Sequence, residues 1–407
     1  MYHSIQKLKN TYHFLQALIA NIYYGFPSRK LKVIGITGTD GKTTTTHLIY
    51  HILKTAGKKV SMISTVYAKV GGKEYDTGLH TTTPDPFLIQ NMLKKSLDNG
   101  EEYFVLETTS HALDQNRVWG VFYEIGILTN VTHEHLDYHK DYEDYLNTKT
   151  LMLRRSRKAV VNKDDESYEK IQEILNTKSN IVTYGLKHTS DYSRDFRNTV
   201  KDLAEFNASN YLGAYAVARL CGIQEKIIET AIQTFILPPG RIDVVYKEEF
   251  TVIIDFAHTP NAIKKILEMV RTVYLQKTGR LIHVFGSAGL RDVSKRPLMG
   301  HSSGKLADVV VLTEEDYRTE DPALISQQIE SGLKKEGLTY KKNLTKQDIK
   351  VYSIILNREK AISQALAIVT KGDVVIITGK GHEKSLCRGK VEYPWNDKDA
   401  VKRLLQL

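Results

Sequence analysis

A glycine-rich run with a lysine and two threonines carries the clearest chemistry in the sequence. Residues 35–44 read G-I-T-G-T-D-G-K-T-T, after an apolar run and before an amphipathic stretch. Glycines let backbone N–H groups approach phosphate oxygens, and a helix N-terminus favours an anion. Lys42 can reach the terminal phosphates of a nucleotide, and Thr43 can hold Mg²⁺.

We therefore predict an ATP site with Mg²⁺ at this loop. The strict phosphate-loop pattern has a glycine where this chain has Ile36, so the run is a variant of that pattern. The residues expected to bind ATP here are Gly38, Thr39, Asp40, Gly41, Lys42, Thr43 and Thr44.

Further along the chain, short runs combine acids, histidines, hydroxyls and glycines in a fixed order. They are Thr82-Thr83-Pro84, Glu107–Leu113 with Gln115 and Arg117, Thr129–His139, Phe206–Asn210, Pro239–Arg241, Asp255–Pro260, Gly286–Asp292, Lys295–Pro297 and Gly379–Glu383. Together with the loop at 35–44, this series resembles the Mur ligases, which form amide bonds at the expense of ATP in peptidoglycan precursor synthesis. The T-T-P, R-D, K-R-P and G-K-G-H-E runs look like the MurE branch, which adds the third amino acid.

The resemblance implies a catalytic and metal-binding group. It places Mg²⁺ on Thr43, Glu107 and His135, and it makes Lys149 a lysine carbamylated by CO₂, whose anionic oxygens help to hold the metal. With Lys42, these residues are the expected catalytic set. Such a site fits the chemistry, because a carboxylate must be phosphorylated to an acyl phosphate before an amine attacks it, and two anions must first be brought together.

The resemblance also assigns the substrate contacts. It gives Asn207 and Asn210 to the adenine side, Arg241 to the phosphates and Asp255 to the ribose. The expected contacts to a muramyl peptide acceptor are Thr81, Thr82, Thr83, Thr109, Gln115 and Arg117. The expected contacts to the incoming amino acid are Arg291, Asp316, Arg318, Gly379 and Glu383. Arginines suit the carboxylates of a zwitterion, and Glu383 suits its ammonium.

The chain departs from the family at three places. Where MurE relatives often read D-N-P-R, residues 315–318 read E-D-Y-R. The acid at 316 suits a cationic end such as that of lysine or another diamino acid, and the alternative interpretation is a surface carboxylate. Glu134 stands where the family has an aspartate before the histidine. Only 34 residues precede Gly35, so we expect the usual N-terminal UDP-binding domain to be absent.

The elements that must position these residues follow an α/β pattern. Apolar β-branched runs expected to be strands alternate with helical stretches such as 43–56 and 86–99, which is typical of a parallel sheet covered on both faces. The expected strands are 31–37, 60–64, 103–107, 125–129, 158–162 and 181–184, and then 251–256, 280–285, 308–313 and 373–378. We predict a helical segment at 1–30, a central P-loop ATPase domain at 31–237 and a C-terminal Rossmann-like domain at 238–407.

Composition excludes several classes of protein. The 407 residues are 41% hydrophobic and 26% charged, as in globular proteins, and the two cysteines indicate neither a disulfide scaffold nor a cysteine zinc site. The net charge of +10 is spread in short groups without a nucleic-acid-binding signature, so small anionic substrates are favoured over nucleic acid. The apolar stretch around 14–24 is too short to span a membrane. We expect a monomer in the cytoplasm.

Three functions remain open from the sequence. The first is a MurE-like ligase that adds an amino acid to a UDP-muramyl dipeptide. The second is a ligase of the same superfamily with another acceptor, of the folylpolyglutamate synthase or cyanophycin type. The third is a nucleotide-binding protein without ligase chemistry, which amine- and acceptor-independent ATP hydrolysis would reveal.

Overall fold

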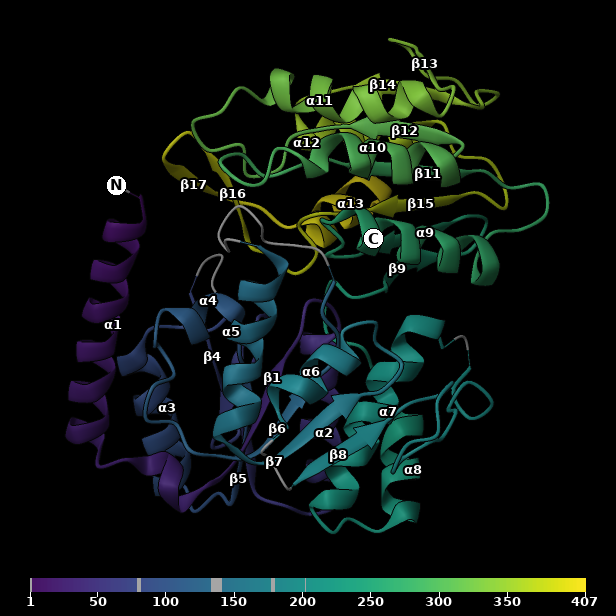
Figure 1. Ribbon diagram of the computed structural model, residues 1–407. Coiled ribbons are helices and arrows are strands. Elements are labelled where there is room, and N and C mark those ends of the chain that lie inside the picture. The colour runs from purple at the N-terminus through teal and green to yellow at the C-terminus, as the bar shows by residue number, and fades with distance from the viewer. Residues whose placement is uncertain (1, 79–81, 133–140, 177–179, 202) are drawn as a thin grey trace. The chain divides into compact units, whose positions relative to one another are not determined.

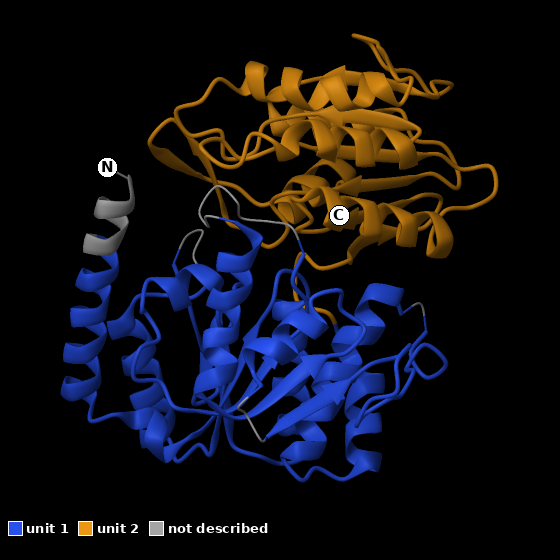
Figure 2. Ribbon diagram, viewed as in Figure 1, with its two compact units in different colours: residues 1–236 blue, residues 237–407 orange. Residues whose placement is uncertain are grey.

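The chain folds as two compact units, residues 1–236 and 237–407 (Figure 2). The computed structural model describes residues 2–78, 82–132, 141–176, 180–201 and 203–407, with the backbone alone at 2–8. Each unit is an α/β layer structure built on one large sheet, which confirms the predicted fold class.

Unit 1 is built on an eight-stranded sheet in the order β4-β3-β2-β5-β1-β6-β7-β8. Its central strands are parallel, whereas β3 and β4 pair antiparallel at one edge. Its elements are α1 (Tyr2–Tyr24), η1 (Pro27–Lys30), β1 (Lys32–Thr37), α2 (Lys42–Thr55), β2 (Val60–Ile63), β3 (Ala68–Val70), β4 (Lys73–Tyr75), α3 (Pro86–Asp98), β5 (Tyr103–Glu107), α4 (Ser110–Asp114), β6 (Tyr123–Leu128), α5 (Tyr142–Arg155), β7 (Ser156–Asn162), α6 (Tyr168–Ile174), β8 (Ile181–Tyr184), α7 (Glu205–Leu220) and α8 (Glu225–Thr234).

Both faces of this sheet are buried under helices (Figure 1). In β1, Ile34 and Ile36 point to a core shared with α2, α7 and α8, while Val33 points to the core shared with α3 and α5. Alternate side chains of a strand point to opposite faces, so a strand covered on both sides must be apolar throughout. This is why the parallel strands read as continuous apolar runs in the sequence.

Unit 2 is built on a seven-stranded sheet in the order β13-β14-β12-β11-β15-β10-β9. The strands are parallel except for β9, which pairs antiparallel with β10, and β16 and β17 form a separate hairpin. The elements are β9 (Asp243–Lys247), β10 (Thr251–Ile254), α9 (Pro260–Val273), β11 (Leu281–Phe285), α10 (Lys295–Leu306), β12 (Val309–Leu312), α11 (Pro322–Lys335), β13 (Thr339–Tyr340), β14 (Val351–Ile354), α12 (Arg358–Ala367), β15 (Val374–Ile377), β16 (Ser385–Arg388), β17 (Val391–Pro394) and α13 (Asp397–Leu405).

A buried ion pair joins two helices of unit 2. Arg358 at the start of α12 donates from Nε and Nη2 to the two carboxylate oxygens of Asp397 in α13, at 2.7 and 2.8 Å, and neither side chain is exposed. The same two helices share an exposed pair, Arg403 with Glu359, at 2.9 Å. The first pair is buried and bidentate, whereas the second is exposed and has a single contact, and removing one partner of a buried pair leaves a charge without compensation.

We expect Asp397→Ala to lower the free energy of unfolding of unit 2 by about 3–5 kcal/mol. Arg403→Ala, the matched change in the exposed pair, is expected to cost less than about 1 kcal/mol. Hydrogen exchange at the amides of β11 and β15 reports unit 2 alone and separates the two variants. Equal losses of protection in both variants would show that burial does not determine how much each ion pair contributes to the stability of unit 2.

Candidate active site

The loop at 35–44 connects β1 to α2, as the sequence predicts, and its glycines are held close to neighbouring side chains. Gly38 and Gly41 have φ of 150° and 81°. A Cβ on Gly38 would lie 1.9 Å from the Thr129 hydroxyl oxygen, and one on Gly41 would lie 2.1 Å from the Asn210 amide oxygen. Any other residue at either position would clash, so the sequence requires glycine here for packing as well as for backbone conformation.

Asn130, the second residue after β6, fixes the tip of this loop. Its amide oxygen accepts from the Asp40 N–H at 2.9 Å, and its amide nitrogen donates to the Asp40 carbonyl at 3.1 Å. Its own carbonyl accepts from the Thr39 N–H, and Thr129 donates to the Asp40 carbonyl at 2.7 Å. The loop is therefore held by side chains of the neighbouring strand as well as by its own turn.

Two lysines converge on the same backbone carbonyl in the loop. Lys42 Nζ donates to the carbonyls of Gly38 at 3.0 Å and Thr39 at 2.8 Å. Lys149, from α5, donates to the Gly38 carbonyl at 2.5 Å, and its Nζ lies 4.4 Å from the centre of the Tyr145 ring. Lys149 is almost fully buried. A buried lysine beside the loop is unusual enough to be a candidate for function.

Glu107 ends β5 and is surrounded by hydroxyl groups. Its Oε1 accepts from the hydroxyls of Thr43 at 2.9 Å and Thr65 at 2.8 Å, and its Oε2 accepts from the Thr65 N–H at 2.8 Å. Carboxylate and hydroxyl oxygens are the ligands that Mg²⁺ prefers, so this group fits a divalent cation. Within the described ranges, no group of three or more His, Cys, Asp or Glu is placed so that it could hold a metal ion, and His135 lies outside them.

The residues assigned to an acceptor form a network next to Glu107. The Thr83 hydroxyl donates to the Glu107 carbonyl at 3.1 Å and accepts from the Thr109 N–H at 3.0 Å. Arg117 donates to the Thr83 carbonyl at 3.1 Å and to the Gln115 amide oxygen at 2.8 and 2.5 Å. Thr82 is half-buried, and Thr81 lies outside the described residues.

Two asparagines in the first turns of α7 complete the loop's surroundings. Asn210 donates to the Asn207 amide oxygen at 3.0 Å, and both side chains are buried. Because the Asn210 amide oxygen faces Gly41, α7 is held against the loop. Seven of the predicted unit 1 residues therefore meet at the carboxyl ends of β1, β5 and β6 or at α7: Gly38, Gly41, Lys42, Thr43, Glu107, Lys149 and Asn210.

In unit 2, Asp255 follows β10 and accepts from two backbone amides. Its Oδ1 binds the Ala257 N–H at 2.8 Å, and its Oδ2 binds the Ile242 N–H at 2.9 Å. Burial raises the pKa of this carboxyl. The Arg241 guanidinium lies 4.7 Å from the centre of the Phe256 ring. Asp255 thus fixes the backbone that carries Arg241.

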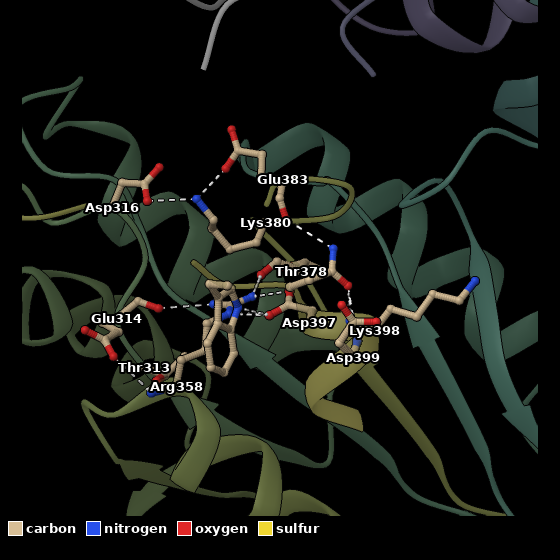
Figure 3. Close-up of polar contacts among 12 residues, drawn as sticks. Thr313, Glu314, Asp316, Arg358, Thr378, Lys380, Glu383, Asp397, Lys398 and Asp399 are labelled. Atoms are coloured by element: carbon tan, nitrogen blue, oxygen red, sulfur yellow. Dashed lines mark hydrogen bonds and ion pairs between the residues drawn. The ribbon is translucent and has the colours of Figure 1, made fainter. Parts of the chain in front are cut away.

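Lys380 lies at the centre of a cluster of charged side chains, shown in Figure 3. It is fully buried and pairs with Asp316 at 2.7 Å and with Glu383. Asp316 also accepts from the Cys387 N–H at 2.8 Å. The acid at 316, predicted from sequence as a contact for a cationic ligand, is therefore already the counter-ion of a buried lysine.

Glu315 was not singled out by the sequence, yet it is the most unusual carboxylate of unit 2. It is 7% exposed, and its Oε2 has no hydrogen-bond partner among the described residues. Burial, and then the negative charge of Asp316, raise its pKa. Gly379, with φ of 104°, leaves room beside it, because a Cβ there would lie 2.7 Å from Glu315 Oε2. Only the three-dimensional packing identifies this residue.

Arg318 is a half-buried guanidinium without a carboxylate partner among the described residues. It donates to the Gly289 carbonyl at 2.7 Å, and its backbone is left-handed, with φ of 53°. By contrast, Arg296, Arg358 and Arg388 pair with Glu320, Asp397 and Glu314. Arg291 is exposed. Unit 2 therefore holds a cation and a carboxylate that each have capacity for a ligand.

Two family models match this chain, the first within unit 1 and the second within unit 2. The model described as the Mur ligase middle domain matches residues 36–218, and that of the Mur ligase, glutamate ligase domain matches residues 240–381.

Similar proteins carry ligase names. The UDP-N-acetylmuramoyl-L-alanyl-D-glutamate--2,6-diaminopimelate ligase of Aquifex aeolicus is 38% identical over 405 residues, which cover 95% of this chain and 80% of that protein. The ligase of the same name from Clostridium botulinum is 33% identical, with 96% of this chain and 81% of that protein covered.

Solved structures resemble most of the chain. A structure of a UDP-N-acetylmuramoyl-L-alanyl-D-glutamate--2,6-diaminopimelate ligase has a TM-score of 0.58 and 27% identity, covering 92% of this chain and 78% of that one. The bifunctional folylpolyglutamate synthase/dihydrofolate synthase of Yersinia pestis, complexed with AMPPNP and Mn ion, has a TM-score of 0.70 at 19% identity, covering 97% and 93%. The latter likeness concerns the fold alone.

We expect Asn130→Ala to loosen the tip of the 35–44 loop. The Asp40 amide loses its acceptor, so its hydrogen exchange should become about tenfold faster, which corresponds to one hydrogen bond. Exchange is measured on the full chain by NMR or mass spectrometry. Asn99→Ala, which removes an amide bonded to the Lys95 carbonyl at the end of α3, is the control and should leave Asp40 unchanged. Unchanged exchange in Asn130→Ala would contradict the assigned role.

Proposed function

We propose that this chain, which belongs to the Mur ligase family, joins a diamino acid such as 2,6-diaminopimelate to UDP-N-acetylmuramoyl-L-alanyl-D-glutamate. It is an ATP-dependent ligase of peptidoglycan precursor synthesis, like the relatives named above. The observation that carries the choice of substrates is the similarity to ligases named for this reaction, which extends across both units.

The reaction proceeds in two balanced steps. A carboxylate oxygen of the acceptor attacks the terminal phosphorus of ATP, and ADP leaves as an acyl phosphate forms. The amine of the incoming amino acid then attacks the acyl carbon, and inorganic phosphate leaves with the amide bond formed and a proton released. The protein must hold several anions close together, which requires cationic and N–H groups.

Unit 1 supplies those groups. The N–H groups of residues 38–44 and the ammonium of Lys42 bind the phosphates, and Asn207 and Asn210 contact the adenine side. When bound, Mg²⁺ neutralises the phosphate charge, and Thr43, Glu107 and His135 hold it. Support for this assignment comes from the hydroxyl and carboxylate oxygens gathered around Glu107.

Lys149 is proposed to act as a carbamate. The ammonium first loses a proton, the neutral amine then adds to CO₂ with formation of a nitrogen–carbon bond, and a second proton leaves, so a cation becomes an anion with two oxygens. Its burial beside the Gly38 carbonyl and the Tyr145 ring supports a role at the loop. Thr81, Thr82, Thr83, Thr109, Gln115 and Arg117 are assigned to the acceptor, with the Arg117 guanidinium offering charge for its carboxylates.

Unit 2 is assigned the incoming amino acid and the rest of the nucleotide. Arg318 and Arg291 bind carboxylates, and Glu383 and Glu315 bind ammonium groups, next to Gly379. Asp316 positions Lys380 and through it Glu383, because it is already paired with that lysine. Arg241 and Asp255 contact the phosphates and the ribose. Glu315 and Glu383, the latter also paired with Lys380, offer two carboxylates for the ammonium groups of a diamino acid.

We expect phosphate release from ATP to require both UDP-N-acetylmuramoyl-L-alanyl-D-glutamate and one diamino acid. Release is measured with Mg²⁺ across a panel of amino acids, and the ligated product is identified by mass spectrometry. Lys42→Ala is the blank, since it removes the ammonium of the phosphate loop. Release without an amine or acceptor would contradict ligase chemistry, and release only with a folate-type or other non-muramyl acceptor would contradict the proposed substrate.

We expect the KM for the amino acid to rise as the pH falls through the raised pKa of Glu315. Burial and the negative charge of Asp316 raise the pKa of this carboxyl, so it becomes protonated at a higher pH than an ordinary glutamate. A protonated carboxyl no longer attracts an ammonium. At pH values above the pKa of Glu315, Glu315→Gln should raise the KM about tenfold. It should also remove this part of the pH dependence. The exposed Glu248→Gln is the control. An unchanged KM profile in Glu315→Gln would refute the assignment.

A further inference from the structure

The outer face of α1 carries a stripe of large exposed apolar side chains. They are Tyr12 (59% exposed), Leu15 (49%), Ile19 (55%), Ile22 (63%) and Tyr23 (75%). At 100° per residue, these positions fall within an arc of about 100° on one side of the helix. We call them the α1 stripe. A contiguous apolar stripe left in water usually marks a binding surface.

The opposite face of α1 already holds the helix on unit 1. Phe14 packs edge-on against Trp119 at 5.0 Å, and Asn21 donates to the Trp119 carbonyl at 2.8 Å. Ala17 and Ala20 are buried, and the helix packs against α3 (Figure 1). The α1 stripe therefore contributes little to docking of the helix, and its exposure is a fixed feature of unit 1.

The charge around α1 indicates what can cover the stripe. Residues 1–39 contain five cations, Lys7, Lys9, Arg29, Lys30 and Lys32, and no aspartate or glutamate. Lys32 pairs with Glu102, whereas Lys9, Arg29 and Lys30 are exposed near the two ends of the helix. Asp114, which accepts from Asn10, contacts α1 away from the stripe. A second copy of α1 packed along the stripe, whether parallel or antiparallel, would place cations next to cations at both ends of the helix.

We propose that the α1 stripe and its flanking cations bind the surface of an anionic lipid bilayer. Leucine, isoleucine and tyrosine enter the boundary between headgroups and acyl chains, while the lysines and arginine meet anionic headgroups. No helix in the described part of the chain is long and apolar enough to cross a bilayer. The helix therefore lies on the membrane, and the interaction is independent of the ligase reaction.

The test is cosedimentation of the full chain with sucrose-loaded vesicles of phosphatidylcholine, with and without phosphatidylglycerol. The chain should bind the anionic vesicles, and binding should weaken as salt is added. The double variant Ile19→Glu/Ile22→Glu should reduce the partition coefficient about tenfold or more, because two apolar side chains no longer enter the interface. Circular dichroism confirms that both forms are folded.

The control is Leu324→Glu/Ile349→Glu, which places the same charges at two exposed apolar positions of unit 2. It should bind as the unchanged protein does. Equal binding by the α1 variant and the unchanged protein, or no binding to anionic vesicles, would overturn the proposal. So would a dimer of the unchanged chain in light scattering that the α1 variant abolishes, since the stripe would then belong to a second copy.

Discussion

Close packing around Gly38 and Gly41 is the constraint on which unit 1 depends. Thr129 and Asn210 occupy the space that a Cβ would need at these two positions, so the loop can adopt its shape only where hydrogen replaces a side chain. Those neighbours come from the end of β6 and from α7, and their positions require the sheet register in which Thr37 pairs with Leu128. The parallel sheet, the helices on both its faces and the loop are thus parts of one arrangement, and Glu107 and Lys149 reach the loop because of it.

Unit 2 has a similar layered α/β architecture, and the feature that distinguishes its site is how its charged side chains are paired. Most of its buried charges are paired within the unit: Arg280 with Asp373, Arg296 with Glu320, Arg358 with Asp397 and Lys380 with Asp316. Against this background the Arg318 guanidinium and the Glu315 carboxyl are exceptions among the described residues. A charge removed from water without a partner is costly, and Glu315 is buried while Arg318 is half-buried, so we propose that a ligand completes the pairing of both.

The sequence predicted the parallel core better than its edges. Continuous apolar runs identified β1, β5, β10 and β11, because a strand covered on both faces has a simple pattern. The strands β4 and β17 are short and largely exposed, and they carry no such pattern. Local motifs also located the loop at 35–44 and Glu107. They could not identify Thr65 or Glu315, since the roles of these residues come from contacts with segments far away in the sequence. Asp316 shows the opposite case, in which an acid noticed in the sequence already binds Lys380.

The left-handed backbone of Arg318 has a consequence for how this protein can change. A non-glycine residue with this φ costs about 1–2 kcal/mol, and glycine or asparagine would relieve most of that cost. Replacements favoured by folding stability at this position are therefore the ones that remove the guanidinium. Random mutation combined with selection for thermostability alone would favour folded, heat-resistant proteins that have lost the carboxylate contact proposed for Arg318. Engineering for robustness should leave position 318 untouched and look for gains elsewhere in unit 2.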